Sequence, residues 1–254
     1  IYNIARTELQ MLFYSPVAWL ILVVFGVQSG MLFADQLAQL VSSQEMGYNV
    51  SGSTITIFAS NWGGVFTTMQ NYLYFYIPLL TMSLVSKELS SGSIRLLYSS
   101  PITNTQIIVG KFFSMMIYGL IMIGILFLIT LCSWAVVKDF ELSMVLTGLL
   151  GLYLLICAYA AIGIFMSSLT SYQIVAAIGT FAVLMVLSMV GGWWQDYDFI
   201  RDVTYWLSMP GRSGKFIAGL ICSEDVLYFV IVVCLFLALT IIRLNSVRQK
   251  IRFV

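Results

Sequence analysis

The sequence predicts an all-α, polytopic membrane protein with six transmembrane helices, and three observations lead to that fold class. From Leu142 to Gln195 the chain contains no Lys, Arg, Asp, Glu or His. Because a transmembrane helix needs about 20 apolar residues, this run must hold two spans joined by a tight turn. Over the whole chain 60% of residues are hydrophobic and 9% are charged, against about 25% charged in soluble domains. The third observation is that the basic residues gather in alternate connections between the apolar windows.

The apolar windows predict the spans in order. Each window is expected to be a helix, because backbone polar groups in lipid must be satisfied within their own segment. With short connections, six spans fill a chain of 254 residues, so residues 1–254 are expected to form a single transmembrane domain. The predicted spans cover residues 17–34, 65–86, 112–137, 142–166, 174–194 and 226–242.

The distribution of charge predicts the orientation of the chain. With both termini in the cytoplasm, the inner segments hold eight basic and two acidic residues, 8 − 2 = +6. The outer segments then hold four basic and nine acidic residues, 4 − 9 = −5, and the two values sum to the net charge of +1. Since cytoplasmic connections are enriched in Lys and Arg, the N-in/C-in topology is preferred over its inverse.

Residues 1–16 are predicted to form an amphipathic helix that lies in the inner membrane interface. Ile4 and Leu12 fall on an apolar face of that helix, while Arg6 and Gln10 fall opposite. The alternative is a cytoplasmic extension of the first span.

The two long outer connections differ in composition. Residues 34–64 are rich in Ser, Gly and Gln and predict a loop or short helices. Residues 195–225 interleave aromatic residues with acids, glycines and Pro210, which indicates interfacial or re-entrant helices. The aromatic residues of this segment are expected to form a belt at the membrane surface, and a lid that contacts cargo is the alternative.

The cytoplasmic segment of residues 87–111 is the part of the chain that most favours a particular function. Pro101 and the serines before it interrupt the segment, and Thr103 then begins the next helix with Gln106 as its capping-box partner. The first half presents a short amphipathic helix to the cytoplasm. A connection that only turned the chain would be far shorter, so we expect this segment to dock on another protein.

Two regions of the sequence carry a recognisable pattern. They cover residues 77–113 and 216–243, and the residues of the pattern are Ile77, Pro78, Leu79, Leu80, Thr81, Met82, Lys87, Glu88, Gly92, Ser93, Ile94, Leu96, Leu97, Pro101, Ile102, Ile107, Gly110, Lys111, Ala218, Gly219, Glu224, Asp225, Val226, Leu227 and Tyr228. Through these residues the chain resembles the type-2 ABC exporter permeases (ABC-2), and within them the gliding-motility-associated permease subunits of Bacteroidota. In two places the chain departs from that pattern: Arg95 stands where an acidic residue is usual, and Ser93 stands where Thr is common. The charge reversal bears on which partner is bound more than on how it is coupled.

The resemblance implies the permease subunit of an ATP-driven exporter in the bacterial inner membrane. Two six-span subunits, identical or paralogous, would each dock on one of two ATPase subunits and move a hydrophobic or amphipathic substrate by alternating access. ATP and Mg would bind to the ATPase subunits, and this chain would carry no cofactor. The ATPase-coupling residues that the resemblance implies are Lys87, Glu88, Gly92, Ile94, Arg95, Leu96, Leu97, Pro101 and Lys111.

No enzyme activity is predicted for this chain. The nearest approach to a phosphate loop lies at Gly214 and Lys215, where Met209 replaces the first glycine and Phe216 replaces the magnesium-binding hydroxyl. The absence of histidine excludes His-based catalysis and His-containing zinc sites. No acidic residue falls inside a predicted span, which disfavours a proton-driven secondary transporter. A channel or scaffold that does not use ATP is the remaining alternative.

Polar residues in the second span suggest a candidate cargo path along Asn71, Tyr72 and Tyr76. Tyr72 and Tyr76 share a helical face, and anchoring at the interface with helix packing is the alternative role. Gly26 and Gly30 form a GxxxG pair in the first span that would let a second helix approach closely.

Overall fold

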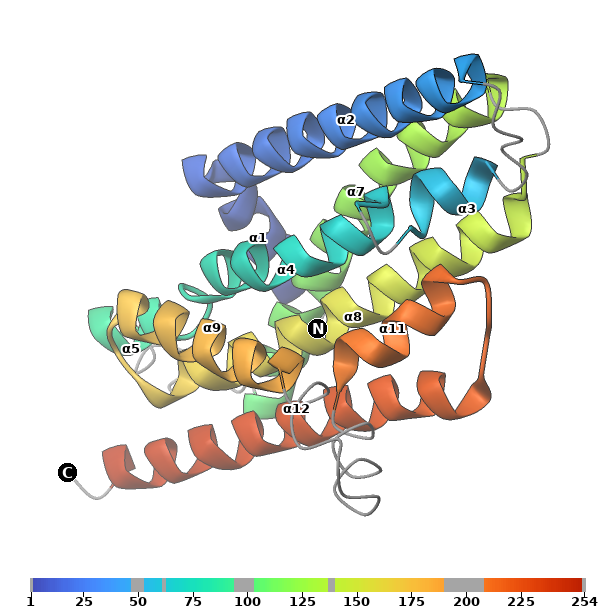
Figure 1. Ribbon diagram of the computed structural model, residues 1–254. Coiled ribbons are helices and arrows are strands. Elements are labelled where there is room, and N and C mark those ends of the chain that lie inside the picture. Colours follow the sequence, from blue (N-terminus) through green and yellow to red (C-terminus); the bar gives the residue numbers. More distant parts are fainter. Residues whose placement is uncertain are drawn as a thin grey trace.

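The computed structural model describes residues 2–46, 53–60, 63–93, 103–136, 140–189 and 208–252. Within those ranges the regular structure is helical throughout, with no strand, which confirms the predicted all-α class (Figure 1). The helices in chain order are α1 (Tyr2–Tyr14), α2 (Pro16–Glu45), α3 (Ser53–Phe58), α4 (Val65–Thr81), α5 (Ser86–Ser91), α7 (Asn104–Val136), α8 (Leu142–Leu169), α9 (Gln173–Met189), α11 (Met209–Ile217) and α12 (Ser223–Arg252).

Four of the described helices, α2, α7, α8 and α12, are long and apolar enough to cross a membrane. Helices α4 and α9 overlap the second and fifth predicted spans, but each has 17 residues. That length is at the lower limit for crossing the hydrocarbon layer, which usually takes about 20 residues. The structure therefore confirms a multi-pass membrane protein, and the count of six spans stays a prediction.

Helix α8 forms the centre of the bundle. In its apolar window 72% of the residues are buried, against 22 to 33% in the other three long helices. Helices α4, α7, α9, α11 and α12 all contact it (Figure 1). A helix that is hydrophobic on every side is expected to be buried, and its small residues let neighbouring helices approach closely. These small residues include Gly148, Gly151, Ala158, Ala160, Ala161 and Gly163.

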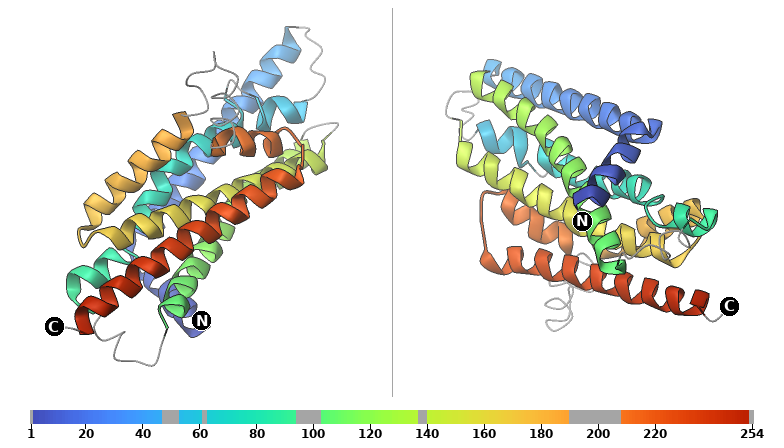
Figure 2. Two further views of the ribbon diagram at one scale, coloured as in Figure 1. Left: turned by 90° about the horizontal axis from the view of Figure 1, so that it is seen from below. Right: turned by 180° about the vertical axis from the view of Figure 1, so that it is seen from behind.

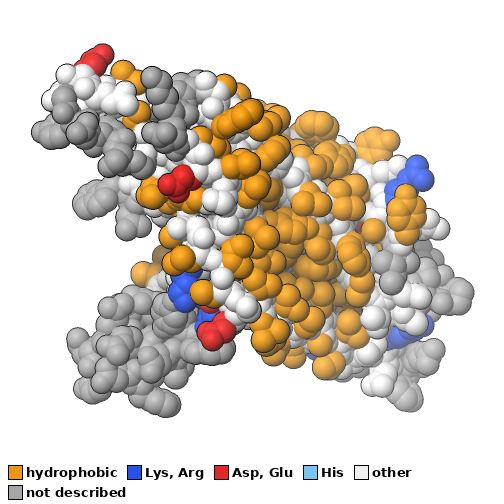
Figure 3. Space-filling model, turned by 90° about the vertical axis from the view of Figure 1, so that its right-hand side faces the viewer, with side chains coloured by type: hydrophobic (Ala, Val, Ile, Leu, Met, Phe, Trp, Pro, Cys, Tyr) orange, Lys and Arg blue, Asp and Glu red, His pale blue; other side chains and the backbone are white. Residues whose placement is uncertain are grey.

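The outer surface of the bundle is apolar where lipid would surround it. Leu20, Leu128 and Ile231 are examples of large aliphatic side chains that are more than half exposed. On the face shown in Figure 3, hydrophobic side chains cover the middle and charged side chains lie towards the edges. So large an exposed apolar surface marks an interface with membrane or protein rather than with water.

The N-terminus and the C-terminus lie on the same side of the bundle as α5 (Figure 2). Helices α3 and α11 lie towards the opposite side. This arrangement agrees with the prediction that both termini and the connector of residues 87–111 share one side of the membrane.

Helix α1 is a separate element and not a continuation of α2. Ser15 has an extended backbone conformation between the two helices, and Pro16 occupies the first position of α2, where its fixed φ favours a helix start. Helix α1 packs closely against α7 at Gly110. A Cβ atom at that position would come within 2.7 Å of the Ile4 side chain, so the close approach requires glycine. The structure thus shows α1 as a helix distinct from α2, and its place in the inner membrane interface stays a prediction.

The first outer connection begins later than predicted. Helix α2 extends beyond the first predicted span to Glu45. Residues 35–45 are therefore part of one long helix, where a loop or short helices were expected. Gln36 and Leu40 are buried in this extension, and α2 contacts the short helix α3. Tertiary contacts therefore stabilise a polar helix that hydropathy alone does not identify as one.

Candidate functional site

The start of the connector is hydrogen-bonded to the central helix through Ser167 of α8. The Ser167 hydroxyl accepts hydrogen bonds from the backbone N–H groups of Val85 and Ser86, at 3.1 and 3.0 Å, and donates one to the carbonyl of Met82 at 2.9 Å. Backbone N–H groups at a helix start have no partner within the helix. The Ser167 side chain therefore provides the missing hydrogen-bond acceptor for the N–H groups at the start of α5. Its bond to Met82 also holds the segment between α4 and α5 against α8.

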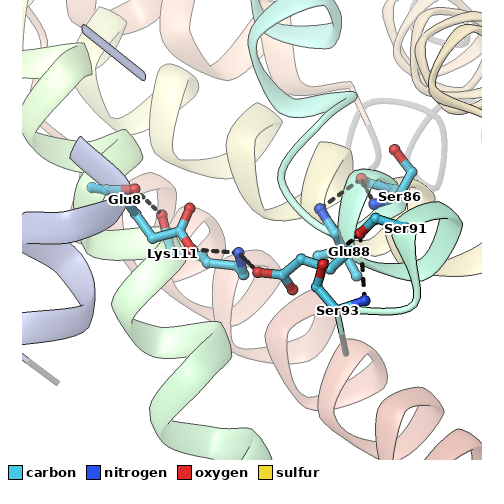
Figure 4. A network of polar contacts seen from close by, with 9 residues as sticks. Glu8, Ser86, Glu88, Ser91, Ser93 and Lys111 are labelled. Carbon is cyan, nitrogen blue, oxygen red and sulfur yellow. Dashed lines mark hydrogen bonds and ion pairs between the residues drawn. The ribbon is translucent and has the colours of Figure 1, made fainter. Parts of the chain in front are cut away.

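Lys111 of α7 is the centre of a buried ion cluster (Figure 4). Its Nζ atom lies 2.6 Å from Oε1 of Glu8 on α1 and 2.7 Å from Oε1 of Glu88 on α5. The lysine is 1% exposed and Glu8 is 8% exposed. A single ammonium group thus joins α1, the connector and α7.

The electrostatics of this cluster are unbalanced by one charge, since two carboxylates share one ammonium group. Burial raises the pKa of the Glu88 carboxyl above its ordinary value, and the charge of Lys111 opposes that rise. A lysine this deeply buried is stable only with partners that compensate for its lost hydration. Glu88 of α5 is one of the two partners that compensate Lys111 in this way.

Helix α5 ends at Gly92, which adopts the left-handed conformation with φ of 70°. Glycine takes this conformation without the steric cost that a Cβ atom would bring, so it is the usual residue at a helix end of this kind. The hydroxyls of Ser91 and Ser93 lie 2.6 Å apart beyond it. Figure 4 shows them near Glu88.

Four of the nine predicted coupling residues fall within the described residues. Glu88 and Lys111 contact each other, Lys87 is exposed on α5, and Gly92 ends that helix. The remaining five, Ile94, Arg95, Leu96, Leu97 and Pro101, lie outside the described residues.

The far end of the connector has the predicted capping box. The backbone N–H of Thr103 donates to Oε1 of Gln106, and the backbone N–H of Gln106 donates to the Thr103 hydroxyl, both at 3.3 Å. At the next residue, the Asn104 side-chain amide donates to Oδ1 of Asn245 on α12 at 2.7 Å. The start of α7 is therefore held to the last helix as well as to α1 and α5.

The candidate cargo path is divided between two environments. Tyr76 is buried, donates its hydroxyl hydrogen bond to Gln28 of α2, and packs edge-on against Phe25. Asn71 and Tyr72 lie exposed on α4. The contacts of Tyr76 match the packing role that was the alternative, and a role of the three residues in cargo movement stays a prediction.

A second buried ion pair lies towards the other end of the bundle. Arg212 of α11 contacts Asp225 of α12, and the two residues are 3% and 1% exposed. The Arg212 guanidinium also lies 4.4 Å from the ring centroid of Tyr228, and Lys215 Nζ lies 3.6 Å from the same carboxylate. Helix α12 begins at Ser223, so Asp225 lies in its first turn, and the predicted last span begins at the next residue, Val226.

Sequence reasoning missed Glu8 and Ser167. Glu8 lies three residues after Ala5 and four before Leu12, within the apolar face of α1, where an acidic residue needs a partner. That position was a usable signal. Ser167 gave no comparable signal, because serines occur throughout apolar helices and its partners lie more than 80 residues away.

The apolar helices and lipid-facing surface define a multi-pass membrane protein, in which two buried ion clusters lie towards opposite ends of the bundle. The chain belongs to the ABC-2 family of transporter proteins, whose family model, described as ABC-2 family transporter protein, matches residues 2–195. It is therefore a membrane transport component of an ABC transporter. A search of curated proteins finds no match. The resemblance to the gliding-motility-associated permeases stays a prediction.

Proposed function

We propose that this chain is the permease subunit of an ATP-driven exporter, coupled through residues 87–111 to a separate ATPase subunit. The observation that carries the proposal is the buried Glu8–Lys111–Glu88 cluster, which joins the first helix of that segment to α1 and α7. Membership of the ABC-2 family supports it, because such permeases generally work with an ABC ATPase subunit.

In this proposal the connector transmits movement from the ATPase to the membrane helices. Helix α5 is bonded to α8 through Ser167 and to α1 and α7 through Lys111, so a force on the connector reaches three helices directly. A connector held this way moves with the helices around it rather than sliding past them. The ATPase subunits would supply the ATP and Mg sites.

The finer parts of the proposal concern assembly and cargo. Two six-span subunits, identical or paralogous, would pair in the bacterial inner membrane with two ATPase copies. The substrate would be hydrophobic or amphipathic and would move by alternating access. The open side of Gly30, where a Cβ atom would meet nothing within 4 Å, is a position at which a second subunit would be able to approach α2.

The test of the proposal is whether the connector holds the ATPase. Leu96→Asp combined with Leu97→Asp is expected to release the ATPase from the purified complex, because truncating a buried apolar anchor typically costs about 2 kcal/mol or more and a carboxylate adds desolvation. The measurement is the ratio of ATPase to permease after purification, with the amount of permease in the membrane fraction as the check on folding.

The matched control places the same two charges on the exposed end of α12, as Ser246→Asp combined with Gln249→Asp. This variant should keep its ATPase. If the connector variant also kept the ATPase at the wild-type ratio, the docking assignment would be wrong, and a channel or scaffold that works without ATP would become the better interpretation.

The proposed N-in/C-in topology predicts which introduced cysteines an impermeant thiol reagent reaches in intact cells. In a background without the native cysteines, Ser42→Cys should react, whereas Ser246→Cys and Ser99→Cys should react only after lysis. Ser42 and Ser246 are exposed near the C-terminal ends of α2 and α12, which lie at opposite ends of the bundle (Figure 1). Reaction of Ser246→Cys and not of Ser42→Cys in intact cells would invert the topology.

A further inference from the structure

A cavity of about 630 Å³ lies beside the ion cluster, bounded by α1, α4, α5, Lys111 of α7 and the starts of α2 and α9. Its volume falls within the range of about 300 to 1,000 Å³ that is usual for small-molecule sites. We propose that this cavity binds a zwitterionic phospholipid from the adjacent membrane leaflet, with its ammonium group at the carboxylates of the cluster and its phosphate at Lys87. This site is independent of the proposed transport function, since its occupancy can be measured without an ATPase.

One part of the cavity is apolar and open to the lipid side. Met11, Val17 and Leu79 line it and are 51%, 40% and 44% exposed, and they come from three different helices. Leu12 and Leu80, which also line it, are buried behind them. An exposed apolar rim in front of an apolar wall suits acyl chains that enter sideways from the bilayer.

The polar part of the cavity carries both signs of charge. Glu8 and Glu88 share Lys111, so the formal charges of the cluster sum to −1, and all three residues line the cavity. That excess favours a cationic group and opposes a ligand that carries only negative charge.

Lys87 supplies the positive charge at the edge of the cavity. It precedes Glu88 on α5, is exposed, and forms no ion pair with any residue in the described part of the chain. Successive residues of a helix point in different directions, and Lys87 forms no ion pair with Glu8 or Glu88, so its ammonium group is not part of the cluster. Ser91 and Ser93 add hydroxyl groups to the same lining. The carboxylates of Glu8 and Glu88 lie inside the cavity and Lys87 lies at its edge. This order of charges complements a phospholipid headgroup, in which the ammonium group is attached beyond the phosphate.

The position of the cavity also suits a lipid. It lies at the end of the bundle that holds α5 and both marked ends of the chain, and α1, whose amphipathic sequence predicts a place at the membrane surface, forms one wall (Figure 2). A headgroup at that level would have its acyl chains beside α2 and α4. The same charges would also attract a soluble phosphate–ammonium compound, so the experiment must separate the two sources.

The test uses a photoreactive phosphatidylethanolamine, with the reactive group near the start of an acyl chain, in phosphatidylglycerol vesicles that contain the purified chain. We expect labelling of the peptides around residues 11–18 and 79–84, located by mass spectrometry. Unlabelled phosphatidylethanolamine should compete, whereas extra phosphatidylglycerol and soluble glycerophosphoethanolamine should not. Equal competition by phosphatidylglycerol, or full competition by the soluble compound, would overturn the proposal.

Two variants and one control show whether the named residues form the site. Lys87→Glu should reduce labelling of these peptides at least tenfold, and Met11→Trp, which fills the apolar rim without changing charge, should reduce it similarly. Arg6→Glu makes the same charge reversal as Lys87→Glu on an exposed residue of α1 outside the cavity lining, and it should label like the wild type. Labelling of α12 serves as the reference for lipid contact in every sample. If Lys87→Glu and Met11→Trp both label like Arg6→Glu, the cavity does not bind the lipid.

Discussion

Replacing Lys111 with methionine is expected to lower the free energy of unfolding by about 3 to 5 kcal/mol, one of the two largest effects of a single substitution that we expect in this protein. Methionine keeps most of the side-chain volume, but Glu8 and Glu88 would then face each other without a counter-charge in a buried site. Removing one partner of a buried ion pair typically has a cost of this size, because the remaining charge stays desolvated. The measurement is denaturant or thermal unfolding of the purified chain in a fixed detergent.

The controls for this prediction separate charge pairing from packing. Lys87→Met removes an exposed lysine from the adjoining helix and should change stability by no more than about 0.5 kcal/mol. The triple variant Glu8→Gln, Lys111→Met and Glu88→Gln should recover much of the loss, since a cluster replaced as a whole leaves no buried charge. A triple variant as unstable as Lys111→Met alone would show that the ammonium group acts in some other way.

The second large effect is expected at Arg212. Arg212→Met removes the guanidinium in closest contact with the buried Asp225 carboxylate, leaving Lys215 Nζ 3.6 Å away, and should also lower the free energy of unfolding by about 3 to 5 kcal/mol. Lys215→Met is the matched control, because Lys215 is farther from the same carboxylate and its side chain is 35% exposed. Its loss should cost about 1 kcal/mol or less.

Hydrogen exchange can also show which helices Arg212→Met destabilises. The pair joins α11 to the first turn of α12, so hydrogen exchange in Arg212→Met should rise first in those two helices and later, if at all, in α1 and α7. Equal effects of Arg212→Met and Lys215→Met on stability would contradict the claim that the buried contact is the important one.

The positions of helix starts were predictable from the sequence because they depend on local chemistry. Helices α4 and α8 begin at Val65 and Leu142, the residues where the second and fourth predicted spans begin. The capping box at Thr103 was equally local, since its two partners are three residues apart. Charge, capping and hydropathy act over one or two helical turns, and a sequence shows them directly.

The partners of Lys111 were not predictable in the same way. The sequence analysis assigned Lys111 to coupling by resemblance, yet hydropathy describes it only as a charge at the edge of an apolar run. Its partners lie 103 and 23 residues earlier in the chain, and their meeting depends on how α1 and α5 are arranged around α7. Distant pairings of this kind are set by tertiary packing, which also explains why Ser167 was overlooked.

The Lys111 cluster also has a consequence for the order of events during synthesis. Glu8 is made 103 residues before its partner, so at the usual rate of about 5 to 20 residues per second α1 exists for roughly 5 to 20 seconds before α7 can receive it. During that interval its apolar face needs another surface, and an amphipathic helix finds one in the headgroup region of the bilayer. The amphipathic sequence of α1 thus predicts its location at the membrane surface before α7 is made. Its later packing against α7 is favoured by the ion pair between Glu8 and Lys111.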